Sequence, residues 1–587
     1  MALQKHLLND PDTLVVDSLT GLCAVNNQLS FDPPNKVVYK SKLDRSKVAL
    51  ICGGGSGHEP SHAGFVGEGM LSAAVCGNVF ASPNSSQVRR GIDLVENDAG
   101  TLILVKNYTG DILNFGLAAE QYAAEHAEKS NKVKFLVVGD DVAVGKTQGG
   151  IVGRRGLAGV VLVYKIAGAL AAQGGTLDEV YSVAEWTAGR IGTIGVGLEH
   201  CHVPGTAPPS SHLSPTEIEI GLGIHNEAGN KRLTPVPPLT ELIPLLIDYI
   251  ASTTDAERGF LPFKNDGSDE VVLLVNNLGG MSELEIGGIV RAARDELHKR
   301  QIGVRRVLAG TRVSICPASP SLSFFSPRAD DSTANAVKLL ALLDAPAQTP
   351  GWKWNSAAPP ITPTPLAPAA TASTTSRSSA ARIAAPQPAE FLAAMQRACA
   401  AIAAAEPEIT RMDTIAGDGD CGLTLKAGAQ GVEKAIKAGG ITGTDLAADV
   451  VAVAKVAENE MGGTSGALYS IFFSALAQGL QSSANGATTV TPELWGSALS
   501  EALTKLYTYT RARPPSRTLV DPLAAFVEAF SSAGFAAAVK AAAAAAEHTK
   551  DVDAKAGRSA YVDTAVLRGE KVPDPGAWGV KTILEAL

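Results

Sequence analysis

Gly-Gly-Gly-Ser-Gly-His occupies residues 53–58 and directly follows Val48–Cys52, an apolar run that predicts a buried strand. The same order returns downstream, where the apolar run Thr101–Val105 leads into a polar turn with glycine. Other patterns predict strands at Lys134–Val138 and Val271–Val275 and a helix at Ser282–Leu297. Strands that alternate with helices favour an α/β fold, with a mainly parallel sheet that helices cover on both faces.

The composition changes sharply between residues 346 and 388. Nine prolines interrupt alanine, serine and threonine in this stretch, and no periodic apolar face persists. We interpret it as an extended linker. The sequence that follows is rich in alanine at helical spacing, for example in Phe391–Ala405 and Leu446–Asn459, and few β-branched runs remain. This pattern predicts an all-α domain.

These patterns predict a multidomain protein with an N-terminal α/β module of two lobes. The glycine-rich segment Gly192–Gly197 marks the expected break between the lobes. We therefore assign residues 1–195 to the first α/β lobe, residues 196–345 to the second α/β lobe, which carries His225, residues 346–388 to the linker, and residues 389–587 to the all-α domain.

The overall composition is that of a soluble globular protein, because 45% of the 587 residues are apolar and 19% are charged. The formal net charge of -9 argues against nucleic acid as the main partner, since nucleic-acid-binding surfaces are basic. The seven cysteines are scattered without a Cys-x-x-Cys pair, so we expect a reducing compartment. The N-terminal residues lack a signal-peptide core, and no uninterrupted apolar run reaches the ~20 residues that span a bilayer. We expect a cytoplasmic protein without a membrane partner.

Three aspartates gather in Asp-Thr-Ile-Ala-Gly-Asp-Gly-Asp-Cys-Gly at 413–422. The carboxylates of Asp413, Asp418 and Asp420 repel one another unless a hard cation neutralises them, and Mg²⁺ prefers oxygen ligands together with nucleotide phosphates. An EF-hand loop that starts at Asp418 fails, because its twelfth position is Ala429 in place of a bidentate Glu. We predict a magnesium site, with a solvated Asp-Gly turn as the alternative.

Other glycine-rich segments differ in what they can bind. Met-Gly-Gly-Thr-Ser-Gly-Ala at 461–467 is expected to open a helix, where free amides favour phosphate, although it also suits tight helix packing. Residues 53–58 lack the dinucleotide spacing, yet glycine there permits a close approach of the backbone to a ligand. Residues 140–147 end like a P-loop, but Asp140 stands where the first glycine is required.

Three polar side chains, His58, Lys106 and Asp111, stand beside glycine turns at predicted strand ends, where ligand sites of α/β proteins gather. A fourth, His225, lies in the Gly-rich stretch Gly-Leu-Gly-Ile-His-Asn-Glu at 221–227. A neutral imidazole at His225 can attack an electrophilic carbonyl and hold it covalently, and Asp111 can accept a hydroxyl proton as general base. A lone histidine is more often a surface or core residue, and spacing alone does not bring the four together.

At these residues the chain resembles the ATP-dependent dihydroxyacetone kinases of the single-chain type, also called glycerone kinases or triokinases. The resemblance covers nearly the whole chain, with nine segments in the family's order. They are Gly-Gly-Gly-Ser-Gly-His-Glu-Pro at 53–60, Lys-Asn-Tyr-Thr-Gly-Asp at 106–111, Gly-Arg-Arg-Gly-Leu-Ala-Gly at 153–159, Gly-Ile-His-Asn-Glu at 223–227, Gly-Asp-Gly-Asp-Cys-Gly at 417–422, Gly-Gly-Thr-Ser-Gly at 462–466, Arg-Thr-Leu-Val-Asp at 517–521, Gly-Arg-Ser-Ala-Tyr at 557–561 and Pro-Asp-Pro-Gly-Ala at 573–577.

The resemblance implies a kinase that transfers the γ-phosphoryl group of ATP to dihydroxyacetone, and to glyceraldehyde, with Mg²⁺ as cofactor. His225 would hold the substrate carbonyl as a hemiaminal, while Asp111 and His58 would assist deprotonation of the hydroxyl. The implied substrate contacts are Gly55, Ser56, Gly57, His58, Lys106 and Asp111.

The all-α domain would be the family's eight-helix barrel, which binds ATP, with Asp413, Asp418 and Asp420 holding the magnesium ion. The implied nucleotide contacts are Cys421, Gly422, Leu423, Thr424, Thr464, Ser465, Leu519, Arg558, Asp574, Pro575 and Gly576. The family forms homodimers in which the nucleotide domain of one subunit faces the substrate domain of the other, so a homodimer is expected here.

One segment departs from the family's pattern. Pro515-Ser516-Arg517-Thr518 stands where the family usually reads Gly-Asp-Arg-Thr, and Thr510 stands where related chains often have glycine. The departure puts the flexibility of a nucleotide-side loop, and turnover, in doubt. Two further functions stay open: an FAD-AMP lyase that forms cyclic FMN at the nucleotide site as a second activity, and a triose-binding protein with weakened catalysis.

Overall fold

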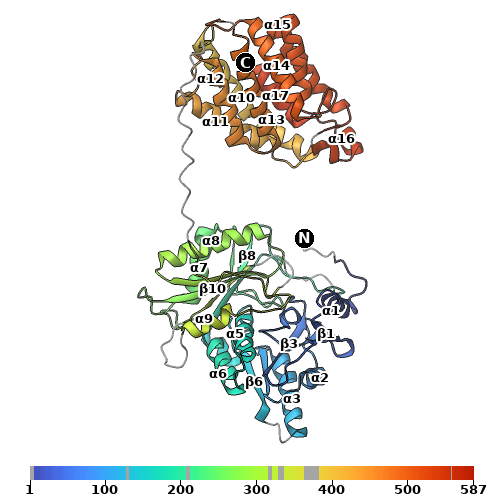
Figure 1. The fold of residues 1–587 in the computed structure, drawn as a ribbon, viewed down its shortest axis with the longest axis vertical. Coiled ribbons are helices and arrows are strands. Elements are labelled where there is room, and N and C mark those ends of the chain that lie inside the picture. The colour runs from blue at the N-terminus through green and yellow to red at the C-terminus, as the bar shows by residue number, and fades with distance from the viewer. Residues whose placement is uncertain are drawn as a thin grey trace. The chain divides into compact units, whose positions relative to one another are not determined.

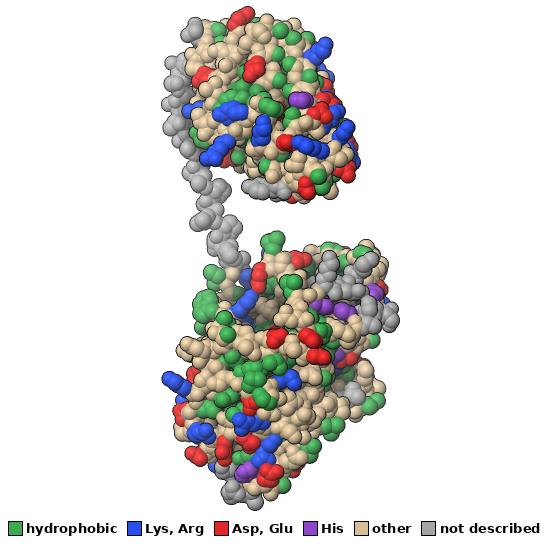
Figure 2. Space-filling model, turned by 90° about the vertical axis from the view of Figure 1, so that its right-hand side faces the viewer, with side chains coloured by type: hydrophobic (Ala, Val, Ile, Leu, Met, Phe, Trp, Pro, Cys, Tyr) green, Lys and Arg blue, Asp and Glu red, His purple; other side chains and the backbone are tan. Residues whose placement is uncertain are grey.

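The computed structural model describes residues 6–126, 131–206, 212–314, 320–327, 336–361, 382–484, 486–556 and 558–587. It divides into two compact units, unit 1 (Met1–Thr364) and unit 2 (Pro365–Leu587), which are described separately (Figure 1). On the face that Figure 2 shows, acidic and basic side chains are interspersed over the surface of each unit.

The first sheet of unit 1 has six strands in the order β1-β2-β4-β3-β5-β6. The strands are β1 (Leu29–Asp32), β2 (Val37–Lys40), β3 (Ala49–Ser56), β4 (Ala73–Val79), β5 (Thr101–Lys106) and β6 (Val133–Val138). Strands β4, β3, β5 and β6 pair in parallel, whereas β2 pairs antiparallel with both β1 and β4. The predicted parallel sheet is therefore confirmed for the strands that carry the Gly-rich and Lys-Asn-Tyr motifs.

The second sheet has six strands in the order β11-β10-β12-β7-β8-β9. The strands are β7 (Ile191–Gly197), β8 (Ile218–Ile220), β9 (Lys231–Leu233), β10 (Glu270–Asn277), β11 (Gly303–Gly310) and β12 (Pro320–Phe325). Only β10 and β11 are parallel, so the prediction of mainly parallel pairing is wrong for this sheet. Parallel neighbours need a long crossover, usually a helix, and the connection from β8 to β9 contains none.

Helices lie in three layers around the two sheets (Figure 1). The helices of unit 1 are α1 (Leu14–Ala24), α2 (Ser85–Leu94), α3 (Thr109–Glu125), α4 (Lys146–Val152), α5 (Val160–Ala172), α6 (Leu177–Ala188), α7 (Leu239–Ala251), α8 (Glu283–Lys299) and α9 (Ala336–Asp344). Helices α2 and α3 cover one face of the first sheet, α5, α6 and α9 fill the space between the sheets, and α7 and α8 cover the second sheet from outside.

Alternation along the strands builds these layers. In β3, Ile51 packs with the α2 and α3 side, whereas Leu50 and Cys52 join the core between the sheets. In β10, Leu274 joins that same central core, and Leu273 packs under α7 and α8. Both faces of each strand are therefore buried, which explains why these segments are continuous apolar runs.

The glycine-rich segment 192–197 lies in the fully buried strand β7, which is the first strand of the second sheet, so the break between the two sheets lies before Ile191. A side chain at Gly192 would come within 3.1–3.2 Å of Val142, Ile250 and Leu261, so glycine serves close packing here. The predicted boundary at residues 195 and 196 therefore falls inside a strand of the second sheet.

The predicted linker at 346–388 includes residues that the structure places in both units. The amide of Gly351 donates to the carbonyl of Gly64 at 2.7 Å, and the buried Arg312 donates to the carbonyl of Gly351 at 2.8 Å. The Arg312 guanidinium also lies over the ring of Trp352, 4.6 Å from its centroid. At the other end, Ile383 is buried in unit 2. Residues 362–381 lie outside the described residues.

Unit 2 is helical in its described part. Its α-helices are α10 (Pro388–Ala416), α11 (Cys421–Lys437), α12 (Leu446–Val456), α13 (Gly463–Ser482), α14 (Pro492–Tyr509), α15 (Val520–His548), α16 (Thr564–Glu570) and α17 (Pro575–Ala586). Helix α10 packs against α11 and α17, α12 against α13, α13 against α14, and α15 against both α14 and α17. The all-α prediction is confirmed.

Helix α15 breaks at Gly534, whose φ of 80° and ψ of 178° are not helical. The alanine-rich helical spacing of the sequence is interrupted at the same place, between Pro522–Phe530 and Phe535–His548. Among the described residues, the stretch Val520–Asp551 is long and apolar enough to cross a bilayer by length and composition. Core helices of soluble proteins pass the same test, and α15 contributes Ala524, Phe526 and other residues to the core of unit 2.

A buried carboxylate ties the two sheets of unit 1 together. Asp140 follows β6 and accepts hydrogen bonds from the amides of Leu157 (2.6 Å) and Gly159 (2.8 Å). It also accepts one from the hydroxyl of Thr193 in β7 (2.5 Å). The residue that argued against a P-loop therefore has a structural role.

We expect Asp140→Ala to lower the free energy of unfolding of unit 1 by about 2–4 kcal/mol, because two amides and a hydroxyl lose their acceptor in the interior. Thermal and urea unfolding of the full chain measure the change. The control Asp295→Ala removes an exposed carboxylate from α8 and should cost less than about 0.5 kcal/mol. Equal losses in the two variants would contradict this role of Asp140.

Candidate active site

Loops of both sheets bring together the four polar residues that the sequence singled out in unit 1. His58 follows β3, Lys106 ends β5, and Asp111 lies in the first turn of α3. His225 comes from the loop between β8 and β9 in the second sheet. The site therefore depends on the two sheets keeping a fixed position relative to one another.

The rings of His58 and His225 meet directly. Their Nε2 atoms lie 3.1 Å apart, and the Nδ1 atom of His58 lies 3.0 Å from the carbonyl oxygen of Ser314. His58 is fully buried, whereas the side chain of His225 is 26% exposed, so a small molecule can approach His225 from solvent. Phe80 stacks on His58 at 4.9 Å and meets His225 edge-on at 5.1 Å.

Lys106 and Asp111 are both buried beside this pair. Burial lowers the pKa of Lys106 and raises that of Asp111, while each opposes the shift of the other through its charge. The hydroxyl of Ser82 donates to the Asp111 carboxylate. Burial and the nearby Lys106 charge hold the pKa of His58 well below its usual value, so its ring is neutral at pH 7.

The structure adds Glu227, which sequence reasoning did not single out. Its Oε1 atom lies 3.0 Å from Nδ1 of His225, and its Oε2 atom accepts a hydrogen bond from the His225 amide at 2.9 Å. Burial alone would raise the pKa of Glu227, but the bonds from the His225 ring and amide lower it to about 2. Its place two residues after His225 in Gly-Ile-His-Asn-Glu was the available signal.

The glycines at 53–57 mostly serve packing of the backbone. A side chain at Gly55 would come within 2.7 Å of the Ala81 amide, and one at Gly57 within 2.6 Å of the Phe80 ring. The hydroxyl of Ser56 donates to the carbonyl of Gly77 at 2.9 Å. Gly54 is the position that faces the site, because a side chain there would lie 3.1 Å from Oδ2 of Asp111. Substrate contacts by Gly55, Ser56 and Gly57 stay predictions.

The three aspartates of unit 2 converge where α10 ends and α11 begins. One carboxylate oxygen each of Asp413, Asp418 and Asp420 lies within 4.8 Å of the others. Asp413 is buried, and its Oδ2 atom accepts from the amides of Asp420 and Cys421, both at 2.9 Å. Three hard oxygen donors at this spacing, two of them exposed, fit a divalent cation such as Mg²⁺.

Glycine is required at each of the three positions of this motif for a different structural reason. Gly419 has a φ of 83°, which favours glycine, and a side chain at Gly417 would lie 2.3 Å from Oδ1 of Asp413. At Gly422 a side chain would lie 2.3 Å from the Thr410 hydroxyl, so this glycine lets α11 pack closely on α10. The turn around Gly417 and Gly419 thus brings the carboxylates together, and Gly422 allows the helices that carry them to pack closely.

The predicted nucleotide contacts whose side chains are described all lie at or next to helix starts. Helix α11 begins with Cys421, Gly422, Leu423 and Thr424; α13 has Thr464 and Ser465 in its first turn; Leu519 precedes α15; and Asp574, Pro575 and Gly576 begin α17. Helix starts offer unpaired amides and a positive dipole end, which favour phosphate. The side chain of Arg558 lies outside the described part of the chain.

The departure at 515–518 leaves an ordered loop. The hydroxyl of Ser516 donates to Oδ2 of Asp521 at 3.0 Å, and its amide donates to Oδ1 at 2.8 Å. An aspartate at position 516 would set a second carboxylate against Asp521, whereas serine supplies a donor. Thr510 has a φ of -129°, an extended conformation that needs no glycine.

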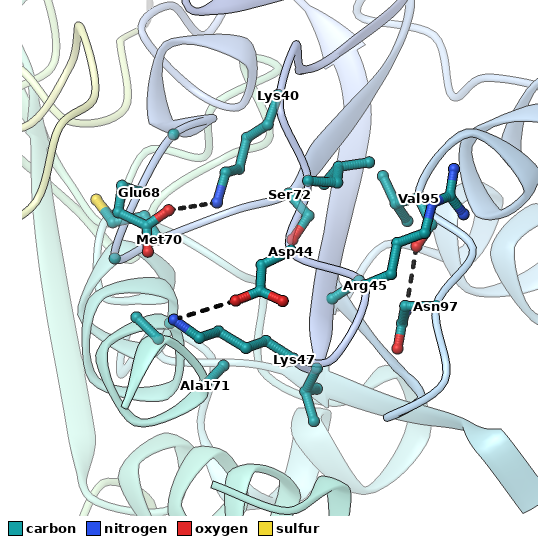
Figure 3. Close-up of a pocket in the computed structure, with 17 residues that line it drawn as sticks. Lys40, Asp44, Arg45, Lys47, Glu68, Met70, Ser72, Val95, Asn97 and Ala171 are labelled. Carbon is teal, nitrogen blue, oxygen red and sulfur yellow. Dashed lines mark hydrogen bonds and ion pairs between the residues drawn. The ribbon is translucent and has the colours of Figure 1, made fainter. Parts of the chain in front are cut away.

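A small cavity of about 40 Å³ lies elsewhere in unit 1, between the strand ends near Lys40 and helix α5 (Figure 3). Four charged residues of its lining form ion pairs, since Lys40 contacts Glu68 at 2.5 Å and Lys47 contacts Asp44 at 3.6 Å. None of the four site residues lines it.

Comparison with known proteins agrees with this division of the chain. Residues 20–351 match the Dak1 domain and residues 415–587 match the DAK2 domain. The chain is 40% identical to a dihydroxyacetone kinase of Pichia angusta, covering 99% of this chain and 97% of that protein. It is 38% identical to the triokinase/FMN cyclase of Homo sapiens, covering 99% and 98%.

A solved structure supports the same relationship. The dihydroxyacetone kinase of C. freundii, crystallised with AMP-PNP and Mg²⁺, is 30% identical to this chain, with a TM-score of 0.63 and 99% coverage of both chains. The match covers residues of both units of this chain. The chain is therefore an enzyme of the dihydroxyacetone kinase family.

Proposed function

We propose that this protein transfers the γ-phosphoryl group of ATP to a terminal hydroxyl of dihydroxyacetone, and also of glyceraldehyde. The observation that carries the proposal is the meeting of a part-exposed imidazole, His225, with the buried groups His58, Lys106 and Asp111 in one site. This site offers a nucleophile, a cation and a carboxylate, which suit a small hydroxylated carbonyl compound rather than an apolar ligand.

In this proposal His225 holds the substrate covalently. The lone pair on Nε2 forms a bond to the carbonyl carbon, and the carbonyl π pair moves to oxygen. The oxygen gains a proton while the ring releases its Nδ1 proton, so the hemiaminal is the simple sum of imidazole and triose. Glycerol has no carbonyl group and cannot form this bond.

The remaining groups act on the hydroxyl. Asp111 accepts its proton as it attacks phosphorus, and the raised pKa that burial gives Asp111 brings this base closer to the pKa range useful at pH 7. Lys106 supplies positive charge beside the reacting oxygens. His58 contacts the His225 ring and assists the hydroxyl. Catalysis by such groups is mainly positioning and charge neutralisation.

Unit 2 supplies the nucleotide in this proposal. Asp413, Asp418 and Asp420 would hold Mg²⁺, which neutralises phosphate charge when bound. The neighbour contacts from α10 to α15, and from α15 through α17 back to α10, support a closed helical barrel. We further propose a cytoplasmic homodimer in which each unit 2 serves the partner's unit 1.

A second activity, cleavage of FAD to AMP and cyclic FMN, is favoured by the full-length likeness to proteins named triokinase/FMN cyclase. It would use the nucleotide site of unit 2 and would not need His225. Incubation with FAD and Mn²⁺ or Co²⁺, followed by chromatography of the flavin products, tests it. The ordered loop around Ser516 gives the alternative of a weakened triose-binding protein no support.

One nucleotide-site carboxylate is unusual. Asp574 is buried, and burial raises its pKa to about 7, although the Ala577 amide and the charge of Arg517 lower it. The carboxylate begins α17 by accepting from the Ala577 amide at 2.9 Å. The folded protein therefore holds a proton there that the unfolded chain loses near pH 4.

The central test is turnover. With Mg-ATP and dihydroxyacetone we expect ADP and dihydroxyacetone phosphate, and with glycerol a rate lower by at least about tenfold. His225→Ala should remove most of the discrimination and the substrate adduct seen by intact mass. The control His298→Ala, at an exposed position of α8, should behave as wild type. Absence of any phosphorylated product in the wild type rejects the proposal.

The metal site has its own test. Asp418→Asn should weaken Mg²⁺ binding in the presence of ATP by roughly tenfold or more, because a charged ligand is lost. The control Glu433→Gln removes a carboxylate on α11 that pairs with Lys437. Calorimetric titration gives both affinities, and equal values for the two variants contradict the assignment.

The pH test concerns Asp574→Asn, which keeps a capping oxygen and removes the charge. As pH rises from about 4 to about 7, the unfolded chain loses this proton while the folded protein keeps it, so the native carboxyl lowers the stability of the fold over this range. The variant should be more stable than wild type at pH 8, by at least about 1 kcal/mol, and equal to it near pH 4. The control Asp563→Asn changes an exposed cap on α16. A gain at pH 8 no larger than the control's contradicts the assignment.

A further inference from the structure

We propose that Glu227, held in place by Arg155 and Asp141, is a positioning residue that fixes the tautomer of His225 so that the Nε2 lone pair is free for the substrate carbonyl. This inference deepens the proposed function and rests on it.

The tautomer follows from the hydrogen bonds of Glu227. Both carboxylate oxygens are engaged by one residue: Oε1 with Nδ1 of the His225 ring at 3.0 Å and Oε2 with the His225 amide at 2.9 Å. A carboxylate with a pKa of about 2 accepts and cannot donate. The ring proton of a neutral His225 therefore lies on Nδ1, and Nε2 carries the lone pair.

His58 presents the same tautomer. Its Nδ1 atom faces the carbonyl oxygen of Ser314 at 3.0 Å, and a carbonyl only accepts, so that nitrogen also carries the proton. In their neutral forms the two rings point lone pairs at one another across 3.1 Å. Because a C–N single bond is about 1.5 Å long, a triose carbon does not fit between the two nitrogens at this separation, so the rings must move apart when the bond to Nε2 of His225 forms.

Arg155 fixes the loop that carries Glu227. Its Nε atom donates to Oδ2 of Asp141 at 2.7 Å, and its Nη2 atom donates to the carbonyl of Gly221 at 2.7 Å. The remaining nitrogen, Nη1, faces the same side of Gly223 as the Glu227 carboxylate, since a side chain at Gly223 would lie 2.5 Å from Nη1 and 2.0 Å from Oε2 of Glu227. Asp141 is itself buried between the sheets.

This arrangement also assists the covalent step. When Nε2 bonds to carbon, the ring becomes a cation that still carries the Nδ1 proton. Glu227 faces that proton and stabilises the positive charge, and the proton leaves through it as the substrate oxygen gains one. A buried carboxylate that orients a reacting histidine has a comparable role in hydrolase triads.

The test uses the full-length protein with histidine labelled by ¹⁵N, with His225→Ala to assign the ring signals. In the wild type we expect the His225 signals of a ring protonated at Nδ1. In Glu227→Gln, one acceptor oxygen serves two donors, so the fraction of this tautomer should fall. Adduct formation with dihydroxyacetone, followed by intact mass, should slow by at least about tenfold. Mg²⁺ and ATP binding should not change.

Two further variants keep the test decisive. Arg155→Gln should also reduce the fraction of the Nδ1-protonated tautomer and slow adduct formation. It serves as the test if Glu227→Gln does not fold. Glu270→Gln removes a half-exposed carboxylate from β10 and should leave both readouts unchanged. A His225 ring that stays protonated at Nδ1 in Glu227→Gln and Arg155→Gln, with adduct formation at the wild-type rate, overturns the inference. Wild-type protein that forms neither adduct nor product rejects the proposed function instead, while the ring signals still report on Glu227.

Discussion

The contact between the Nε2 atoms of His58 and His225 constrains the rest of unit 1, because its two members come from different sheets. To hold them 3.1 Å apart, the fold must fix the sheets to one another as well as the loops on each sheet. The structure does so with a common core of α5, α6 and α9 and with buried polar links. Asp140 joins the end of β6 to Thr193 in β7, and Arg155 joins Asp141 to the loop of His225.

In unit 2, the fold keeps three carboxylates close together despite their mutual repulsion. Two backbone amides at the start of α11 satisfy the buried Asp413, while Asp418 and Asp420 stay exposed. The positive end of α11 thus offsets part of the negative charge. Charge repulsion in a protein site is tolerated where function requires it, and in the proposed magnesium site a divalent cation would neutralise the three carboxylates.

Much of the fold could be predicted from local pattern. Buried strands such as β3 and β5 are apolar runs, and the helices of unit 2 follow alanine-rich periodicity, so both were found from the sequence. The glycines at 192–197 led to a lobe boundary a few residues too late, because the sequence alone does not distinguish glycine in a packed strand from glycine in a loop. The same holds for residues 346–361, whose attachment depends on the distant Arg312. Glu227 was missed because only the folded loop shows that both of its oxygens serve His225.

The proposed function depends on a covalent bond between His225 and a triose carbonyl, which carbon NMR can test directly. Dihydroxyacetone labelled with ¹³C at the carbonyl is added to protein with ¹⁵N-labelled histidine. We expect the bound carbon to move from the carbonyl region to that of a tetrahedral carbon and to couple to one histidine nitrogen, with both features absent in His225→Ala. A bound carbon that stays a carbonyl, or couples to no nitrogen, while the enzyme still phosphorylates the substrate contradicts the account.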